Sequence, residues 1–259
     1  MGRYDNSTVS AAHDLDARSD WALFLDVDGT IVDIAARPED VVVHPRLQAT
    51  LLRLRERLGG ALALVSGRSI ATLDSLFAPL GLDMAGLHGL EVRINGEQRS
   101  HVESEASMRG IVNYLRLETA GWEGVIVEDK GATVALHYRL APDSRGSVEQ
   151  LLAQAITILG AGYRIQTGKF VYEVLPGKAD KAAAIRDFMR HPPYLGRQPI
   201  FAGDDDTDDC AFAMVNDSGG LSIGVGPRGQ PLARLRLMSP VIMRRWLEGL
   251  AGDLSAGRF

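Results

Sequence analysis

The sequence has few of the features that would point to a secreted or membrane protein. Its 259 residues include one cysteine, Cys210, which excludes an internal disulfide and is typical of a reducing compartment. No apolar run reaches the length of a membrane-spanning helix. The first twenty residues are polar and acidic, unlike a signal peptide. The cytoplasm is therefore the expected location.

Positive charge is also scarce. The chain has 28 lysines and arginines against 33 acidic residues, a net charge of −5, and no basic run beyond Met243-Arg244-Arg245. This balance argues against nucleic acid or an anionic membrane as the main partner, and it leaves room for a local positive pocket for phosphate. We find no internal repeat and no low-complexity linker. With 46% hydrophobic and 24% charged residues, the composition predicts a globular protein with a proper core.

Alternating apolar segments predict an α/β fold built on a doubly wound parallel sheet of the Rossmann-like kind. Residues 22–25 and 61–65 are apolar runs typical of strands buried on both faces. The leucines of residues 45–58 recur at helical spacing, and another helix is expected at 70–79. The same rhythm returns late in the chain, with elements expected at 179–189, 199–202, 207–215, 220–225 and 240–250. Ligands of such sheets bind beyond the carboxyl ends of the strands.

The middle of the chain breaks this rhythm and predicts an inserted α+β domain. Asn95-Gly96, between short alternating runs, is a hairpin signal. Further on, helices are expected near 107–120 and 147–159, with strands near 124–128, 132–138, 163–166 and 169–175. We therefore expect a polar leader at 1–20, a core made of 21–103 and 174–259, and a cap inserted between its halves at 104–173.

The segment Asp26-Val27-Asp28-Gly29-Thr30 leaves the first strand with two carboxylates two residues apart. Both can face one cleft, and clustered carboxylates suit a hard cation such as Mg²⁺. One carboxylate can then attack phosphorus while the other moves protons. Two other interpretations compete with catalysis. One is a plain strand-to-turn transition, and the other is a calcium loop, although such a loop places glycine sixth and Gly29 comes fourth.

Three later features add candidates at expected strand ends or helix starts. Ser66 could hold phosphate oxygens together with nearby N–H groups, or it could be a turn or capping serine. Lys181, in the first turn of a helix, could neutralise a transferring phosphoryl group, or it could be a solvated surface lysine. Residues 203–209 contain five aspartates directly after an apolar run. So many carboxylates at a buried strand end would repel one another without a cation, although helix N-termini also attract acids.

In this order the motifs resemble the haloacid dehalogenase superfamily of aspartate-nucleophile phosphotransferases, over residues 21–250. Further segments are similar to trehalose-6-phosphate phosphatases: Ser66-Gly67-Arg68, Gly86-Leu87-His88-Gly89, Glu128-Asp129-Lys130, Leu136-His137-Tyr138-Arg139, Val171-Tyr172-Glu173-Val174 and the acidic loop. Two residues depart from that pattern, since Ala182 stands where glycine is expected and Asp209 where glutamate is usual. Lys178 leaves open which lysine reaches the phosphate.

The resemblance implies a reaction and the residues that perform it. The reaction is the Mg²⁺-dependent hydrolysis of trehalose 6-phosphate to trehalose and phosphate, through an aspartyl-phosphate. Asp26 would be the nucleophile and Asp28 the general acid and base. Ser66 and Lys181 would be further catalytic residues that hold the phosphate. The cap would recognise the sugar and so determine specificity.

The resemblance also implies how the metal and the substrate are bound. Mg²⁺ would be held by Asp26, the backbone carbonyl of Asp28, and Asp204. Asp205 and Asp208 would support the metal's water ligands or the lysine from outside. The implied substrate-binding residues are Gly67, Arg68, His88, Glu128, Lys130 and Glu173.

Two alternatives stay open beside this function. The first keeps the chemistry and changes the substrate to another sugar phosphate. The second is a catalytically silent domain that binds a phosphosugar or a trehalose-6-phosphate synthase, although both aspartates, the lysine and the acidic loop are present. The expected partners are therefore a small-molecule substrate and, in addition, such a synthase.

Overall fold

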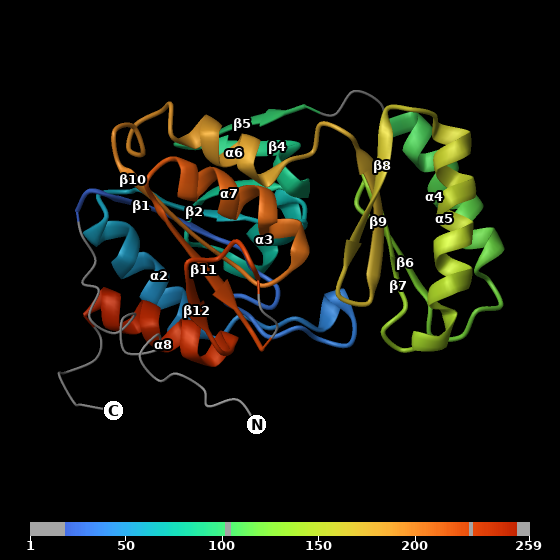
Figure 1. Ribbon diagram of the computed structural model, residues 1–259, viewed down its shortest axis with the longest axis horizontal. Coiled ribbons are helices and arrows are strands. Elements are labelled where there is room, and N and C mark those ends of the chain that lie inside the picture. Colours follow the sequence, from blue (N-terminus) through green and yellow to red (C-terminus); the bar gives the residue numbers. More distant parts are fainter. Residues whose placement is uncertain (1–18, 102–104, 228–229, 253–259) are drawn as a thin grey trace.

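The computed structural model describes residues 19–101, 105–227 and 230–252, and it places their strands in two sheets (Figure 1). The large sheet has eight strands in the order β12-β11-β10-β1-β2-β3-β4-β5, and the small sheet has four in the order β6-β7-β9-β8. Of the expected leader at 1–20, only Ser19 and Asp20 fall within the described residues. No helix in the described ranges is long and apolar enough to cross a membrane.

The large sheet is parallel from β12 to β3 and antiparallel from β3 to β5. Its strands are β1 (Trp21–Leu25), β2 (Leu62–Val65), β3 (Asp83–Gly86), β4 (Glu91–Ile94), β5 (Glu97–Ser100), β10 (Gln198–Gly203), β11 (Leu221–Val225) and β12 (Leu235–Leu237). The register pairs Leu23 of β1 with Ile200 of β10 on one side and with Leu62 of β2 on the other. β1 is therefore a central strand, and the segment that follows it begins in the middle of the sheet.

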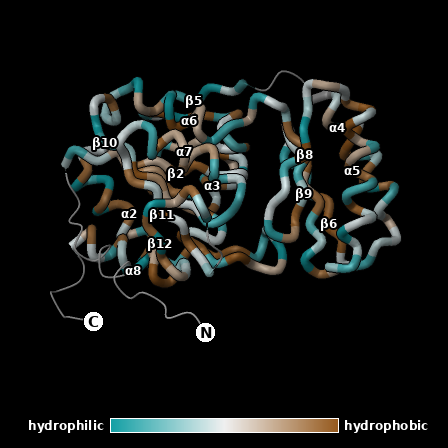
Figure 2. Tube along the Cα trace, in the orientation of Figure 1, coloured by the Kyte–Doolittle hydropathy of each residue, from teal (hydrophilic) through white to brown (hydrophobic). Residues whose placement is uncertain are grey.

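Burial explains why the central strands are apolar along their whole length. Every residue of β1 and β2 is buried, because helices cover both faces of a doubly wound sheet. Figure 2 shows hydrophobic residues along the central strands and hydrophilic residues on β5 at the edge. The four residues of β5 are all exposed. The edge of the sheet is thus polar, as is usual where a strand has a free side.

Helices connect and cover these strands, which confirms the predicted α/β fold with a doubly wound sheet. They are α2 (Pro45–Arg57), α3 (Ile70–Phe77), α6 (Lys181–Phe188), α7 (Asp209–Asp217) and α8 (Pro240–Ala251). α2 packs against α8, and α6 packs against α7. Short 3-10 helices lie in the connections: η1 (Pro38–Asp40), η2 (Leu87–Gly89), η3 (Pro142–Ser144) and η4 (Asp206–Asp208).

The small sheet belongs to a segment between β5 and α6, which we call the insertion. It consists of α4 (Glu105–Glu118), β6 (Ile126–Asp129), β7 (Val134–His137), α5 (Arg145–Leu159), β8 (Tyr163–Gly168) and β9 (Val171–Pro176). Figure 1 shows α4 and α5 on the outer side of the small sheet, so that the other face of that sheet is turned toward the large one. β9 continues past residue 173, where we expected the insertion to end.

Strict alternation gives the small sheet one apolar and one polar face. Val134 and Leu136 of β7, and Tyr172 and Val174 of β9, belong to a hydrophobic cluster with the two helices. Polar residues next to apolar ones along these strands and their ends point the other way. They are Glu128, Lys130, His137, Gln166 and Glu173, and all of them line one cavity. The insertion presents polar side chains to the large sheet because its apolar side chains are packed against α4 and α5.

Some elements were predicted and others were not. The hairpin signal is confirmed, since β4 and β5 pair antiparallel around Asn95 and Gly96, both with positive φ. The strands β3 and β12 were not expected. β3 is four residues long and includes an aspartate and a glycine, and β12 has three residues. Such short segments carry no periodicity, and neighbouring strands rather than local sequence fix them.

Candidate active site

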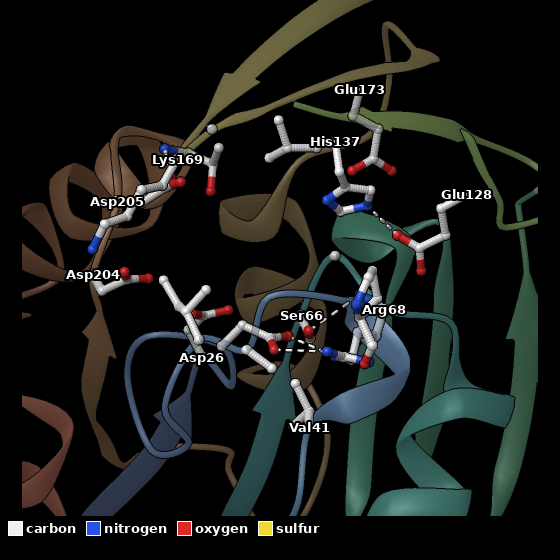
Figure 3. A pocket seen from close by; sticks show the side chains of 18 of the residues that line it. Asp26, Val41, Ser66, Arg68, Glu128, His137, Lys169, Glu173, Asp204 and Asp205 are labelled. Atoms are coloured by element: carbon white, nitrogen blue, oxygen red, sulfur yellow. Dashed lines mark hydrogen bonds and ion pairs between the residues drawn. The ribbon is translucent and has the colours of Figure 1, made fainter. Parts of the chain in front are cut away.

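A cavity of about 160 Å³ lies between the carboxyl ends of the parallel strands and the polar face of the insertion. Figure 3 shows its two sides: Asp26, Ser66 and Arg68 lie below, and Glu128, His137 and Glu173 lie above. Of the residues that the sequence predicts for the site, Asp208 alone is absent from the lining of this cavity. The large sheet therefore places its candidates where a doubly wound sheet is expected to bind a ligand.

Asp26 stands at the end of β1 and is 5% exposed. Its backbone N–H donates to Ala202 of β10 at 2.9 Å, so the sheet ladder holds its position. Each carboxylate oxygen has a partner: Lys181 Nζ donates to Oδ1 at 2.8 Å, and Thr30 Oγ1 donates to Oδ2 at 3.1 Å. Burial raises the pKa of Asp26 to about 7, although the Lys181 ammonium acts in the opposite direction. A second cation beside Lys181 would favour the ionised form of this carboxylate.

Lys181 joins the end of β1 to the acidic loop. It begins α6, whose N-cap is Asp180, and its Nζ donates to Asp26 at 2.8 Å and to Asp208 at 2.6 Å. Burial alone would lower the pKa of this lysine, but Asp208 and Asp26 outweigh burial and raise it. Lys178 is exposed three residues earlier. The structure thus brings Lys181 onto the predicted nucleophile and into the lining of the cavity.

The acidic loop after β10 has an internal order. Asp205 caps η4 by accepting from Thr207 N at 2.6 Å, and Asp208 closes a capping box with it. The second oxygen of Asp208 accepts N–H bonds from Asp204 at 2.9 Å and from Asp205 at 3.2 Å. Both oxygens of Asp208 are therefore engaged by the lysine and the loop, whereas Asp204 turns toward β1.

Asp204 meets the turn that follows β1. A Cβ added at Gly29, whose φ is +78°, would lie 2.1 Å from Asp204 Oδ2, so this approach requires glycine. Burial, and then the charge of Asp26, raise the pKa of Asp204 to about 9. One oxygen each from Asp26, Asp204 and Asp208 lie within 4.8 Å of one another. If all three are ionised, these carboxylates and the Lys181 ammonium carry two negative charges in excess, and hard oxygen ligands fit a divalent cation such as Mg²⁺.

Ser66 and Arg68 follow β2 in a tight turn. Ser66 is 2% exposed, and its Oγ accepts from Arg68 N at 3.1 Å. It does not cap α3, because Ser69 does so by accepting from Thr72 N. The Arg68 guanidinium donates to both oxygens of Asp28, from Nε at 2.6 Å and from Nη2 at 2.8 Å. The turn therefore brings a hydroxyl and an arginine beside the Asp-x-Asp segment.

His88 enters the cavity through a strained turn. It has φ +56° and ψ +33°, and Leu87 before it also has positive φ, a backbone region that residues other than glycine rarely adopt. A Cβ at Gly67 would lie 2.7 Å from His88 Nε2, so the glycine leaves space for this ring. His88 is 7% exposed, and its Nε2 lies 3.2 Å from Glu173 Oε2.

Glu128, Lys130 and Glu173 converge from three places in the insertion onto one patch of its polar face. Lys130 Nζ contacts Glu173 at 3.0 Å, Glu128 at 3.9 Å, and the carbonyl of Gly67 across the cavity at 3.2 Å. Thr133 Oγ1 donates to Glu173 at 2.5 Å. Burial favours the neutral acid, but Lys130 and His88 hold the pKa of Glu173 below its usual range. These ionised groups, Glu173 buried and the other two partly buried, present donors and acceptors to a polar ligand.

Comparison with known proteins gives this geometry its context. Residues 24–230 match the family described as trehalose-phosphatase. A probable trehalose-phosphate phosphatase of Sinorhizobium fredii strain NGR234 is 48% identical over 236 residues, which are 91% of this chain and 88% of that one. The chain belongs to the trehalose-phosphatase family. It is therefore a phosphatase with the haloacid dehalogenase fold, as the resemblance implied.

Two further relatives of the trehalose-phosphatase family are similar over most of the chain. The trehalose-6-phosphate phosphatase of Escherichia coli strain K12 is 39% identical over 239 residues, 92% of this chain and 89% of that one. A solved structure of a trehalose-6-phosphate phosphatase related protein matches with a TM-score of 0.72 and 28% identity, and it covers 89% of this chain and 97% of that one. Members of the superfamily generally depend on Mg²⁺, and the cluster of buried aspartates in this phosphatase could bind such a metal.

Sequence reasoning on this trehalose-phosphatase family member quoted His137 and Arg139 only within a segment similar to the family, and it named neither of them nor Gln166 as a site residue. His137 Nε2 lies 2.7 Å from Glu128 Oε2, and Gln166 Nε2 lies 3.2 Å from His88 Nδ1. Arg139 donates to the carbonyls of Ala35 and Lys169 and lines the same cavity. The signal that was available is alternation, because His137 follows the buried Leu136 and Gln166 follows Ile165 of the apolar face.

Proposed function

We propose that this protein hydrolyses trehalose 6-phosphate to trehalose and inorganic phosphate, with Mg²⁺ as its cofactor. The observation that carries the proposal is that two groups of residues face each other across one cavity. Below lie Asp26 and Lys181, which suit phosphoryl transfer. Above lie Glu128, Lys130 and Glu173, which suit a neutral sugar with many hydroxyls. The names of the two curated relatives supply the identity of the sugar.

The chemistry follows from the positions of Asp26 and Asp28. Asp26 attacks phosphorus in line, so that a carboxylate O–P bond forms while the bond from phosphorus to the sugar oxygen breaks. Asp28 gives its proton to that leaving oxygen. The same carboxylate then takes a proton from the water that attacks the aspartyl-phosphate, which frees Asp26 and releases phosphate. Lys181 and Ser66 hold the phosphate oxygens and offset the repulsion between a dianion and two carboxylates.

Asp26, Asp204 and the backbone carbonyl of Asp28 would hold Mg²⁺, with Asp205 and Asp208 supporting the site. When bound, the ion would neutralise phosphate charge and polarise the group for attack. The raised pKa values of Asp26 and Asp204 support this proposal, because both carboxylates need a cation to stay ionised together. Asp208 serves differently, since its oxygens orient Lys181 and the loop.

Asp204→Asn tests this metal site. The amide keeps the shape but loses a charge and a good ligand, so we expect the Mg²⁺ concentration for half-maximal activity to rise at least about tenfold. Activity should recover in part at high Mg²⁺. Calorimetric titration of the substrate-free protein with Mg²⁺ measures the same loss directly. Asp206→Asn, an exposed change in the same loop, is the matched control. An unchanged Mg²⁺ dependence in Asp204→Asn would make this loop a solvated turn.

We propose that the insertion acts as the cap that determines specificity, with Gly67 and His88 completing the sugar site from the large sheet. Contacts of Lys130 with Gly67 and of Glu173 with His88 join the two sides, which supports this role. The test is phosphate release by the purified protein from a panel of sugar phosphates, with and without Mg²⁺. Preference for a different sugar phosphate would keep the chemistry and replace the substrate. Binding without turnover would favour the silent phosphosugar-binding domain.

Glu128→Gln tests the role of the cap. Loss of the charged partner of a buried sugar hydroxyl costs about 1–3 kcal/mol of binding free energy, so kcat/KM for trehalose 6-phosphate should fall about tenfold or more. Hydrolysis of p-nitrophenyl phosphate, which has no second sugar, should change little. Asp129→Asn, the exposed neighbour on the same strand, is the control and should affect neither substrate. A proportional loss on both substrates would place Glu128 in the phosphoryl-transfer machinery or in folding.

The setting of this reaction is a further part of the proposal. A single cysteine is compatible with a reducing compartment, and we place the enzyme in the cytoplasm. An association with a trehalose-6-phosphate synthase, which would supply the substrate, can be tested by co-purification of the two proteins.

A further inference from the structure

Arg68 has its guanidinium fixed on two partners, and neither is in the insertion. Nε and Nη2 donate to the two oxygens of Asp28 at 2.6 and 2.8 Å, and Nη1 donates to the carbonyl of Pro38 at 3.1 Å. The arginine is 8% exposed. It lies beside Ser66 at the floor of the cavity (Figure 3). Three of the five N–H donors of the guanidinium are therefore committed within the protein.

The backbone of Arg68 is held as firmly as its side chain. Its N–H donates to Ser66 Oγ at 3.1 Å, and its carbonyl accepts from Leu87 N at 2.9 Å. A bidentate arginine–carboxylate pair restricts both the distance and the plane of the carboxylate, which a lysine cannot do. Asp28, by contrast, is one-third exposed, and among the side chains of the described residues Arg68 is the one that hydrogen-bonds its carboxylate. The orientation of Asp28 depends on this pair.

We propose that Arg68 is a positioning residue that acts through Asp28, and that it holds this carboxylate toward the leaving oxygen instead of binding the substrate itself. The inference rests on the proposed function, in which Asp28 transfers a proton to the sugar oxygen. That transfer needs one oxygen of Asp28, and the other can remain on the guanidinium. Arg68 thus fixes the position of the general acid, and the hydrogen bond to the carbonyl of Pro38 keeps the guanidinium in place.

The competing role for Arg68 is the one that the sequence predicts, direct contact with the substrate. A role in binding the phosphate differs from positioning in its dependence on the leaving group, and a role in binding the sugar differs in that its loss would add to the loss from Asp28→Asn. An arginine that binds the phosphate would matter equally for every phosphate ester and for inorganic phosphate. An arginine that positions Asp28 would matter only where the leaving oxygen needs a proton. A sugar alkoxide needs one, whereas p-nitrophenolate leaves as a stable anion.

Arg68→Lys and Arg68→Gln distinguish these roles through kcat/KM, which reports the first step of the reaction. For trehalose 6-phosphate we expect a fall of about 30-fold or more, within the roughly 10²–10⁴-fold that general acid catalysis contributes. For p-nitrophenyl phosphate we expect a fall of less than about threefold, because protonation is not needed there. Competitive inhibition by inorganic phosphate should change by less than about twofold, because the phosphate site is untouched. Arg68→Lys keeps the positive charge but cannot reproduce the fork, so it should show the same selectivity.

Two controls make the outcome specific. Arg93→Lys breaks a bidentate pair of the same kind, with Asp74 at 2.8 and 2.6 Å, away from the cavity, and it should change neither substrate. Asp28→Asn should show the selectivity of Arg68→Lys. The double variant should lose little more activity than either single variant, since Arg68 and Asp28 act together and each change removes the same function. The ratio of the two substrates does not depend on the fraction of folded protein, so partial unfolding leaves the test valid.

Equal losses on both substrates, with weaker inhibition by phosphate, would overturn the proposal and make Arg68 a phosphate-binding residue. Selectivity in Asp28→Asn without selectivity in Arg68→Lys would also overturn it and leave the proposed function intact. If Asp28→Asn itself showed no selectivity, the acid role of Asp28 in the proposed function would fail. The experiment therefore separates failure of the inference from failure of the function on which it rests.

Discussion

Asp26→Asn is expected to abolish turnover while leaving the fold intact. The amide has the shape of the carboxylate but cannot form a bond to phosphorus, so we expect phosphate release to fall on the order of 10⁴-fold or more. The surroundings should tolerate the change. The amide oxygen of the variant can still accept from Lys181, and the Thr30 hydroxyl can turn to accept from the new NH₂ group. Lys181 keeps Asp208 as a charged partner at 2.6 Å in this variant, and burial already disfavours the charge of Asp26, so its removal should cost little stability.

The measurement has a kinetic and a chemical part. Rapid mixing with p-nitrophenyl phosphate should give a burst of nitrophenolate in the unaltered protein and none in Asp26→Asn. Acid-quenched protein should carry a hydroxylamine-sensitive phosphate in the first case alone. Asp26→Ala guards against a trace of activity from deamidated asparagine. Metal-dependent phosphate release above about one part in 10³ in both variants would be too much for a lost nucleophile and would move that role to another residue.

The fold was predictable where local sequence carries the tertiary information. β1 and β2 are buried on both faces, so their sequences are apolar throughout and stand out. The strands of the insertion were expected within a few residues because apolar and polar residues alternate along them. β3 and β12 were missed because three or four residues define no period, and their pairing depends on strands elsewhere in the chain.

The candidate site was predictable as a set of residues and not as a set of contacts. Asp26 and Asp204 could be named because both directly follow strands, whose ends meet at one edge of the sheet. The partner of Arg68 could not, because Asp28 lies 40 residues away and no local pattern encodes which side chain a guanidinium will meet. Nor could the sequence tell that Lys181, and not Lys178, contacts Asp26, because this depends on α6 beginning directly after its N-cap Asp180.

A second large effect is expected for the variant Lys181→Met. Lys181 is 3% exposed and offsets two buried carboxylates, so its loss leaves Asp26 and Asp208 to repel one another. Removing one partner from a buried ion pair costs about 3–5 kcal/mol of stability. Turnover should fall about 10³-fold or more, because the phosphate loses a cation and Asp26 becomes harder to ionise. Lys178→Met, three residues earlier and exposed, is the matched control and should change neither quantity.

The stability of Lys181→Met should depend on pH in a way that identifies the cause. Lys181 lowers the pKa of Asp26, which is about 7 in its presence, so the variant should hold that pKa higher still. The folded variant then binds more protons than the unfolded chain, where the carboxyl has its ordinary value of 3.8. The free energy of unfolding of the variant must therefore fall as pH rises from the pKa of Asp26 in the unfolded chain to its higher pKa in the folded variant. We expect urea unfolding to show a smaller deficit against the unaltered protein at pH 5 than at pH 8. A deficit that is the same at both pH values would mean that the lost packing of the lysine stem, and not the unbalanced carboxylates, destabilises the fold.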